Sequence, residues 1–207
     1  RRNNKLWKPI DRWMYNRYKH VICISDQAEK NLRVYLGSKH YTPITTIYNG
    51  IDVDAYYSAE PIAGMHPVNK FVVVMVAAFR RQKDQKTLIE AIAQLPQQEF
   101  ELWLAGDGHT RPEIEQFVAE KNLAQQVKFL GNRTDVPNLL HTGDAICMSS
   151  HYEGLSLSNL EGMSAGRPFI ATDVDGLREV TAGYGILFPH EDSVALAKII
   201  RKLPWRS

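Results

Sequence analysis

Short, almost wholly apolar runs alternate along the chain with segments in which apolar residues recur every three or four positions. Beyond residue 70 the apolar runs lie at residues 71–77, 99–105, 127–130, 145–148, 168–171 and 186–188. The segments that follow them are helical in pattern, at residues 85–95, 112–121, 135–141, 157–165, 177–180 and 192–203. Continuous apolar strands that alternate with helices are typical of a parallel sheet with both faces covered. The pattern therefore predicts an α/β fold, a Rossmann-like, doubly wound parallel sheet.

The first 52 residues show a shorter alternation of the same kind. Residues 21–24 and 44–48 read as strands, on either side of a helix that Ser25 or Asp26 caps and Gly37 ends. Residues 1–20 hold seven Lys and Arg against one acid, and their apolar residues recur at helical spacing. Such an amphipathic basic helix can lie on anionic lipid or pack its apolar side on a protein core, and we favour packing. Residues 53–69, with two prolines and a glycine, read as a linker.

Composition narrows the class of protein and its compartment. The 207 residues are 44% hydrophobic, and a formal net charge of +2 argues against a dedicated nucleic-acid binder. Cys23 and Cys147 each lie in an apolar run and read as small buried hydrophobes of a reducing compartment, not as a disulfide. The longest apolar run, residues 71–79, is too short to cross a bilayer. We therefore expect a cytoplasmic protein, with the inner face of the membrane reached through the basic helix, and a chain that is part of a longer one.

Candidate chemistry is concentrated between residues 149 and 176. A loop with Glu153 and Gly154 follows one apolar run and leads into a helix that holds Glu161. The loop therefore lies at the carboxyl end of a strand, where open α/β sheets bind ligands. Gly154 lets backbone approach a ligand closely, and the first amides of the helix, at Leu157 and Ser158, offer a seat for phosphate.

Glu161 lies one turn into that helix, close enough to accept hydrogen bonds from a vicinal diol such as a ribose. Two carboxylates on either side of a phosphate seat suit a nucleotide sugar. Two simpler readings compete with this one. Residues 158–161 fit a capping box, in which Glu161 satisfies only its own helix, and Glu153 can be an ordinary exposed loop carboxylate.

Glu153, seven residues, and then Glu161, inside an EG…LEGMSAG-RP frame, resemble the donor-site signature of the retaining GT-B glycosyltransferases of family 4 (group 1). The resemblance implies that residues 70–207 are a nucleotide-sugar donor-binding domain and residues 1–52 the end of an N-terminal acceptor-side domain that is otherwise absent. It implies transfer of a sugar from a UDP- or GDP-linked donor to a sugar or lipid-linked acceptor. The anomeric configuration would be retained, with no metal or other cofactor and no nucleic acid involved.

The resemblance also assigns roles to residues. Glu153 would be catalytic and would hold the donor sugar together with Gly154, Leu155 and Ser156. The diphosphate would lie on Leu157, Ser158, Lys83 and Arg80, the ribose on Glu161, and the nucleobase against Asn132 and Arg133. The family places an Arg where this chain has Ala78, so Arg80 or Arg81 is expected to replace it. We expect no metal, because the dispersed histidines His109, His141, His151 and His190 show no ligand spacing.

Two functions from other classes stay open. The chain can be a donor-binding module that works only with a separate acceptor-binding subunit. It can also be another GT-B enzyme of nucleotide sugars, such as an epimerase. The nucleotide, the sugar, the acceptor and the oligomeric state are not determined by these patterns.

Overall fold

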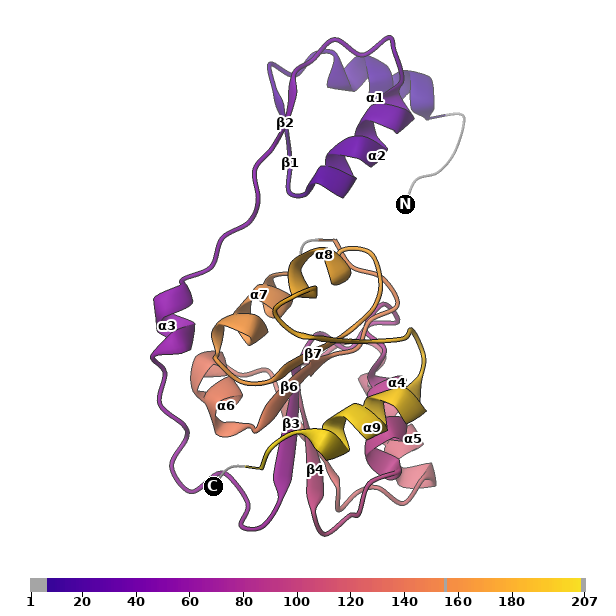
Figure 1. Cartoon of the computed structure of the whole chain (residues 1–207). Helices are drawn as coiled ribbons and strands as arrows, with labels where there is room; N and C mark the ends of the chain where they lie inside the picture. Colours follow the sequence, from indigo (N-terminus) through magenta and orange to yellow (C-terminus); the bar gives the residue numbers. More distant parts are fainter. Residues whose placement is uncertain (1–6, 155, 206–207) are drawn as a thin grey trace. The chain divides into compact units, whose positions relative to one another are not determined.

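A computed structural model describes residues 7–154 and 156–205 (Figure 1). The chain divides into two compact units, Arg1–Gly50 and Ile51–Ser207. We describe each unit by itself. Leu155, one of the residues predicted to hold the donor sugar, lies outside the described residues.

The smaller unit is built on one parallel strand pair, β1 (Val21–Cys23) with β2 (Ile44–Thr46). Helix α2 (Asp26–Leu36) begins at Ser25, whose hydroxyl accepts a hydrogen bond of 3.2 Å from the Ala28 amide. Helix α1 (Lys8–Tyr15) buries none of its eight residues. Its apolar side chains are exposed, namely those of Ile10, Trp13 and Met14. Among the described residues, the apolar stripe expected to pack on a core is thus exposed. The helix packs on its unit through Tyr15, which contacts the small core of Cys23, Leu36 and Ile44.

Within the described part of the larger unit, six strands form one sheet in the order β5-β4-β3-β6-β7-β8, and every pair is parallel. The strands are β3 (Phe71–Val76), β4 (Phe100–Ala105), β5 (Val127–Gly131), β6 (Ala145–Met148), β7 (Phe169–Thr172) and β8 (Ile186–Phe188). Four of these strands, β3, β4, β6 and β7, are buried almost throughout, as their largely apolar sequences require.

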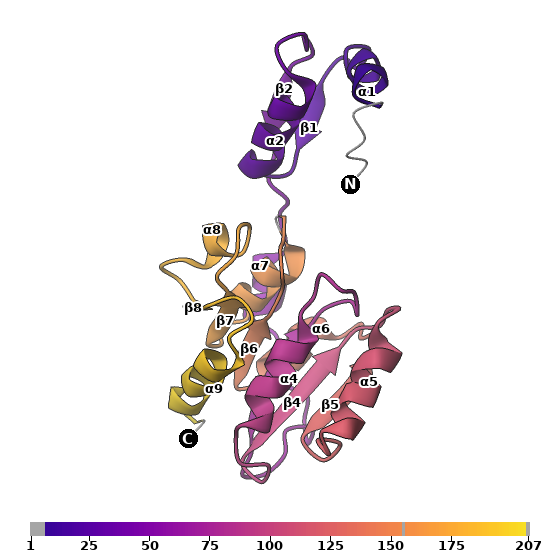
Figure 2. The same ribbon diagram turned by 90° about the vertical axis from the view of Figure 1, so that its right-hand side faces the viewer.

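Helices cover both faces of this sheet (Figures 1 and 2). Helices α4 (Gln85–Ala93), α5 (Arg111–Glu120) and α9 (Ser193–Lys202) lie on one face. Helices α6 (Val136–Thr142) and α7 (Leu157–Ser164) lie on the other, and the short α8 (Arg178–Thr181) follows β7. The predicted Rossmann-like, doubly wound parallel sheet is confirmed, and its strand and helix ends differ from the prediction by only a few residues.

The segment expected to be a linker contains a short helix, α3 (Val53–Tyr57). The Asp52 carboxylate caps it by accepting from the Ala55 amide at 3.1 Å. Tyr56, Ile62 and Met65 pack against the core of the larger unit. This segment therefore belongs to the folded unit, which its proline and glycine content did not indicate.

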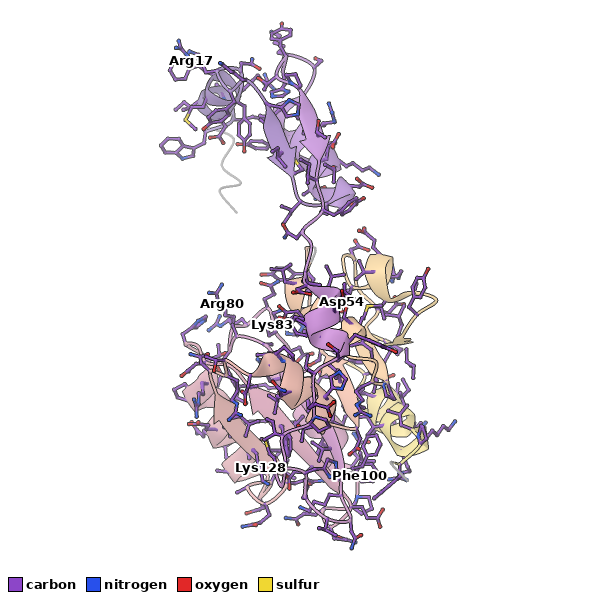
Figure 3. The ribbon with its side chains drawn as sticks, turned by 90° about the vertical axis from the view of Figure 1, so that its left-hand side faces the viewer. Arg17, Asp54, Arg80, Lys83, Phe100 and Lys128 are labelled. Carbon is purple, nitrogen blue, oxygen red and sulfur yellow. The ribbon has the colours of Figure 1, made fainter. Side chains whose placement is uncertain are left out.

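The strand order fixes where a ligand can bind. The chain enters the sheet at β3, winds outward to β5, and returns to the other side of β3 at β6. The connections that leave β3 and β6 therefore turn to opposite faces, and such a topological switch point opens a crevice at the carboxyl ends of the strands. Figure 3 shows Arg80 and Lys83 at that end of the unit, and Phe100 and Lys128 at the opposite end.

Candidate functional site at the carboxyl ends of β3 and β6

The two loops at the switch point are hydrogen-bonded to each other. Lys83 and Ser150 form an isolated antiparallel bridge. The Asp84 amide donates to the Ser149 carbonyl at 3.0 Å, and the His151 amide donates to the Gln82 carbonyl at 2.9 Å. Asp84 also caps α4 by accepting from the Thr87 amide at 3.1 Å. Backbone hydrogen bonds thus hold the loop after β3 against the loop after β6, and Asp84 fixes both to the start of α4.

Glu153 is held by three donors from these loops. Its Oε1 atom accepts from Lys83 Nζ at 2.5 Å and from Ser150 Oγ at 2.9 Å, and its Oε2 atom accepts from Gln82 Nε2 at 3.0 Å. The side chains of Lys83 and Glu153 are only 13% and 7% exposed. Glu153 is therefore not an ordinary exposed loop carboxylate. It is a buried, fixed anion paired with the lysine that the family resemblance singled out.

Gly176 lies against the backbone of the Glu153 loop, whereas Gly154, next to Glu153, has open space beside it. At Gly176, in the loop after β7, φ is +85°, and an added Cβ would lie 2.4 Å from the Glu153 carbonyl oxygen. Only glycine permits that close contact, so the loop after β7 supports the Glu153 backbone. At Gly154 an added Cβ would meet no described atom within 4 Å, and φ is not positive. The fold does not require glycine there, and the space beside Gly154 is open.

Helix α7 begins two residues before the predicted capping box. Its N-cap is Ser156, which has an extended backbone and makes no side-chain capping hydrogen bond. Its third helical residue is Asn159, so the capping-box interpretation of Glu161 is wrong. The amides of Leu157 and Ser158 occupy the first turn, where a helix has no internal acceptors, and no hydrogen bond from them to a described residue is found. Amides at the first turn of a helix are the kind of donors that bind anions, so the predicted role of these two amides stays a prediction.

Glu161 is half-buried on α7. The described contact of its carboxylate is with Tyr56 of α3, not with Glu153 or the donors that hold Glu153. Burial and a hydrogen bond to Glu161 together raise the pKa of Tyr56, on α3, to about 12. The phenol therefore remains a donor throughout the physiological range. Tyr56 lies in the segment that read as a linker, so its contact with Glu161 could not be expected from the sequence pattern.

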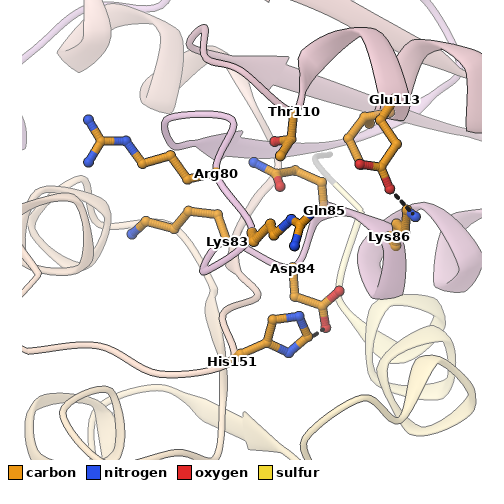
Figure 4. Close-up of a pocket in the computed structure, with 10 residues that line it drawn as sticks. Arg80, Lys83, Asp84, Gln85, Lys86, Thr110, Glu113 and His151 are labelled. Atoms are coloured by element: carbon orange, nitrogen blue, oxygen red, sulfur yellow. Dashed lines mark hydrogen bonds and ion pairs between the residues drawn. The ribbon is translucent and has the colours of Figure 1, made fainter. Parts of the chain in front are cut away.

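Arg80 and Arg81 are exposed and line a cavity of about 340 Å³ between the loop after β3 and the start of α5 (Figure 4). Lys83, Lys86 and His151 line the same cavity, so its four Lys and Arg side chains outnumber its two carboxylates, Asp84 and Glu113. Lys86 is paired across it with Glu113 at 2.6 Å. The structure thus places Arg80 and Arg81 beside Lys83, and the residue at the position of the family arginine, Ala78, contributes only its carbonyl, which accepts from Gln85.

The predicted nucleobase residues follow β5. Asn132 is exposed, while Arg133 forms a forked pair with Asp135, with Nε–Oδ1 and Nη2–Oδ2 distances of 2.8 and 2.5 Å. The hydrogen bonds from Arg133 hold the pKa of the Asp135 carboxyl below its usual value. The Arg133 guanidinium is therefore engaged within the protein.

Comparison with known proteins identifies the family. A family model described as glycosyl transferases group 1 matches residues 70–204, and one described as Glycosyltransferase Family 4 matches residues 1–55. The chain belongs to the group 1 glycosyl transferases. This confirms the predicted glycosyltransferase family, group 1, and the six-stranded parallel sheet is the architecture of solved GT-B enzymes.

Three relatives illustrate the similarity of this group 1 glycosyl transferase. It is 34% identical over 139 residues to the lipopolysaccharide core biosynthesis glycosyltransferase LpsD of Rhizobium meliloti, covering 66% of this chain and 40% of LpsD. It is 28% identical over 222 residues to alpha-D-kanosaminyltransferase of Streptomyces kanamyceticus, covering 96% of this chain and 55% of that protein. The crystal structure of Anabaena HepE in complex with UDP-glucose matches with a TM-score of 0.78 and 28% identity, covering 94% of this chain and 56% of that one. The chain thus spans about half the length of the relatives it matches.

Among the helices of residues 7–154 and 156–205, none combines the length and the apolar character that crossing a membrane requires.

Cys23 and Cys147 are both free and buried. Burial raises the pKa of the Cys147 thiol, which keeps it protonated and unreactive.

Proposed function

We propose that this chain binds a nucleotide sugar and serves a glycosyltransferase that moves the sugar to a sugar or lipid-linked acceptor with retention of the anomeric configuration. Residues 70–207 would form the donor-binding part, and residues 1–52 would end the acceptor-side domain. The relatives support the kind of donor and acceptor. HepE is described in complex with UDP-glucose, and LpsD is described as a glycosyltransferase of lipopolysaccharide core biosynthesis.

The observation that carries this proposal is the state of Glu153. Three donors fix its carboxylate, and open space lies beside the next residue, Gly154. These donors offset the free-energy cost of burying the carboxylate and fix its position, and a fixed carboxylate next to open space suits a binding role. In this proposal Glu153 contacts the hydroxyl groups of the donor sugar, and Gly154 and Ser156 provide the backbone against which the ring lies.

The leaving diphosphate would be neutralised by protein groups alone. The amides of Leu157 and Ser158 lie in the first turn of α7 and donate to no described backbone group. Arg80 and Lys83 supply positive charge from the loop after β3, and Lys83 shares its charge with Glu153. Charge-assisted hydrogen bonds of this kind contribute about 1.5–3 kcal/mol each. They stabilise the charge that develops on the leaving group, so no metal is invoked for the transfer step.

The ribose would replace Tyr56 as the partner of Glu161. The phenol now donates to this carboxylate, and a ribose diol offers two hydroxyl donors in its place. Because the pKa of Tyr56 is about 12, the phenol keeps its proton at neutral pH and can donate it in a hydrogen bond to Glu161. The nucleobase would lie against the turn at Asn132 and Arg133, through backbone groups, since Asp135 already engages the Arg133 side chain.

Calorimetric titration of the chain with UDP and with UDP-glucose tests the donor site. Loss of a charge-assisted hydrogen bond predicts that Lys83→Ala and Glu161→Ala each weaken UDP binding by about tenfold or more. Glu153→Gln, which keeps the shape of the side chain, should weaken UDP-glucose more than UDP. Lys121→Ala, an exposed lysine on the loop after α5, is the matched control and should bind as the unaltered chain does.

Unchanged UDP affinity in folded Lys83→Ala and Glu161→Ala chains would refute the donor site. A parallel titration with GDP and GDP-glucose decides between the two nucleotides. Retention is tested separately on the full-length enzyme by the coupling constant of the product's anomeric proton, and an inverted product would remove that part of the proposal alone.

Helix α1 provides a candidate contact with a lipid-linked acceptor. Ile10, Trp13 and Met14 are exposed on a helix that also carries Lys8 and Arg12. Such a surface binds anionic bilayers through apolar insertion and charge. Sedimentation with phosphatidylglycerol vesicles should retain the chain and lose the Trp13→Ser variant, and equal retention of both would exclude this contact.

A further inference from the structure

His151, beside Glu153, meets two consecutive residues that lie far from it in the sequence, His190 and Glu191. His151 belongs to the loop after β6, and His190 and Glu191 follow β8. His151 Nδ1 lies 2.9 Å from His190 Nε2 and 3.3 Å from Glu191 Oε1, and His190 Nε2 lies 3.8 Å from Glu191 Oε1. Among the described residues, these form the group whose ligand atoms are close enough to hold one metal ion.

The geometry points to a binding site for a zinc-class transition metal, formed by His151, His190 and Glu191. Ligand atoms bound to one Zn²⁺ at 2.0–2.1 Å lie about 3.3–3.4 Å apart in a tetrahedral site. The three distances here average about 3.3 Å. A point about 0.7 Å above the plane of the three atoms, where a tetrahedral ion would sit, is about 2.1 Å from each of them.

The chemistry of the three groups selects the metal. Two imidazole nitrogens and one carboxylate oxygen suit Zn²⁺, Co²⁺ or Ni²⁺ better than Mg²⁺ or Ca²⁺, which prefer oxygen ligands alone. The side chains of His151, His190 and Glu191 are 34%, 40% and 61% exposed, so an ion can enter from solvent and a water can complete the coordination.

Charges around the group bear on the affinity. The buried Asp84 carboxylate lies 3.9 Å from His151 Nδ1 and adds negative potential behind this ligand. The cations of the neighbouring cavity oppose it, namely Arg80, Arg81, Lys83 and Lys86. Lys83 and Lys86 are each paired with a glutamate, which reduces their effect on a bound cation.

The backbone at Glu191 is unusual in a way that the site explains. Its φ is +60°, at the third position of a turn closed by the Asp192 amide donating to the Pro189 carbonyl at 3.1 Å. Glycine or asparagine is the usual residue at such a position. The left-handed conformation brings the side chains of two consecutive residues, His190 and Glu191, to the same point. A metal there would join the loop after β8 to His151, two residues before Glu153, and would order the donor-sugar loop.

Zinc titration of the full chain, after removal of metals and of any affinity tag, tests this site by competition with a chromophoric chelator. The unaltered chain should bind one equivalent of Zn²⁺. His151→Ala and His190→Ala should each weaken that binding by about 100-fold or more, because a direct ligand counts for at least as much as a supporting residue. His109→Ala removes an exposed histidine from the loop after β4 and should leave binding unchanged.

Two further readouts separate a built site from a histidine pair that only shares a hydrogen bond. Co²⁺ in the unaltered chain should give the intense visible absorption of a four-coordinate ion, and Zn²⁺ should slow amide hydrogen exchange in residues 149–154 and 187–191 together. Absence of stoichiometric zinc in the unaltered chain, or equal zinc in the two histidine variants, would overturn the inference. The metal site is independent of the proposed donor-binding function, so the absence of zinc binding would leave the donor-binding proposal unchanged.

Discussion

Removing one member of the buried pair between Lys83 and Glu153 should cost much stability, although the intact pair contributes little net stability, because the remaining charge is left unpaired. The perturbation is Lys83→Met, which keeps the length of the side chain and removes the charge 2.5 Å from Glu153 Oε1. Removing one partner of a buried ion pair costs roughly 3–5 kcal/mol, since the other charge is left uncompensated. Glu153 keeps its hydrogen bonds to Ser150 and Gln82, so we expect about 3 kcal/mol, at the lower end of that range.

For a unit of this size, about 3 kcal/mol corresponds to a fall of roughly 6–12 °C in melting temperature. The assay is urea and thermal unfolding of the larger unit, followed by circular dichroism. The double variant Lys83→Met/Glu153→Leu should recover most of the loss, because replacing both members of a buried pair by apolar residues is often nearly neutral. Lys121→Met, whose nearest carboxylate is 3.9 Å away and exposed, should cost less than about 0.5 kcal/mol. A Lys83→Met cost no larger than that of the control would refute the buried-pair argument.

Three other substitutions have definite signs. Gly176→Ala should cost roughly 2–4 kcal/mol, because its Cβ would lie 2.4 Å from the Glu153 carbonyl, whereas Gly183→Ala, with φ +84° but open space, should cost about 1 kcal/mol; equal losses by urea unfolding would contradict the contact. The pKa of Tyr56 is raised from 10 to about 12, so its contribution is complete below pH 10 and is lost as pH rises toward 12; Tyr56→Phe should cost about 1 kcal/mol at pH 8 and flatten that alkaline loss. Burial acts to raise the pKa of Glu101, but hydrogen bonds from lysine and tryptophan side chains outweigh it and hold the pKa below 4.5. The contribution of the Glu101 carboxylate to stability is therefore present above pH 4.5 and is lost as pH falls through its pKa in the folded state. Glu101→Gln should remove that acid dependence of stability.

Most of the sheet could be predicted from the sequence, because a strand that is buried on both faces must be apolar throughout. The run at β3 illustrates this, and β4 illustrates its limit, since Glu101 interrupts the apolar pattern and is nonetheless 2% exposed. Its carboxylate accepts from Trp103 Nε1 at 2.6 Å and from Lys128 Nζ at 2.6 Å. Trp103 lies on the same strand and Lys128 on the neighbouring one, so Glu101 is accommodated inside β4. Hydrophobic periodicity alone would not predict a buried glutamate there.

Contacts between loops could not be predicted in the same way. The spacing of Glu153 and Glu161 identified the family, but it gave no sign that Gln82 and Ser150 would hold one carboxylate or that Tyr56 would hold the other. Those partners are set by the order of the strands, which brings distant loops to one edge. The histidines show the same effect: His151 and His190 are 39 positions apart, and only the parallel pairing of β6, β7 and β8 brings their rings to a centroid distance of 5.1 Å.

The Glu153 loop is supported from three directions before any donor is bound. Lys83 and Gln82 hold its carboxylate from the loop after β3, Gly176 contacts its backbone from the loop after β7, and His190 contacts His151 from the loop after β8. A ligand that binds a site already fixed in this way loses less free energy to the ordering of side chains than one that must organise the loop itself. The same argument limits which changes the site tolerates. A substitution in any of the three supporting loops should weaken the proposed donor binding without touching the donor. A side chain at Gly176, whose Cβ would lie 2.4 Å from the Glu153 carbonyl oxygen, should do so most strongly.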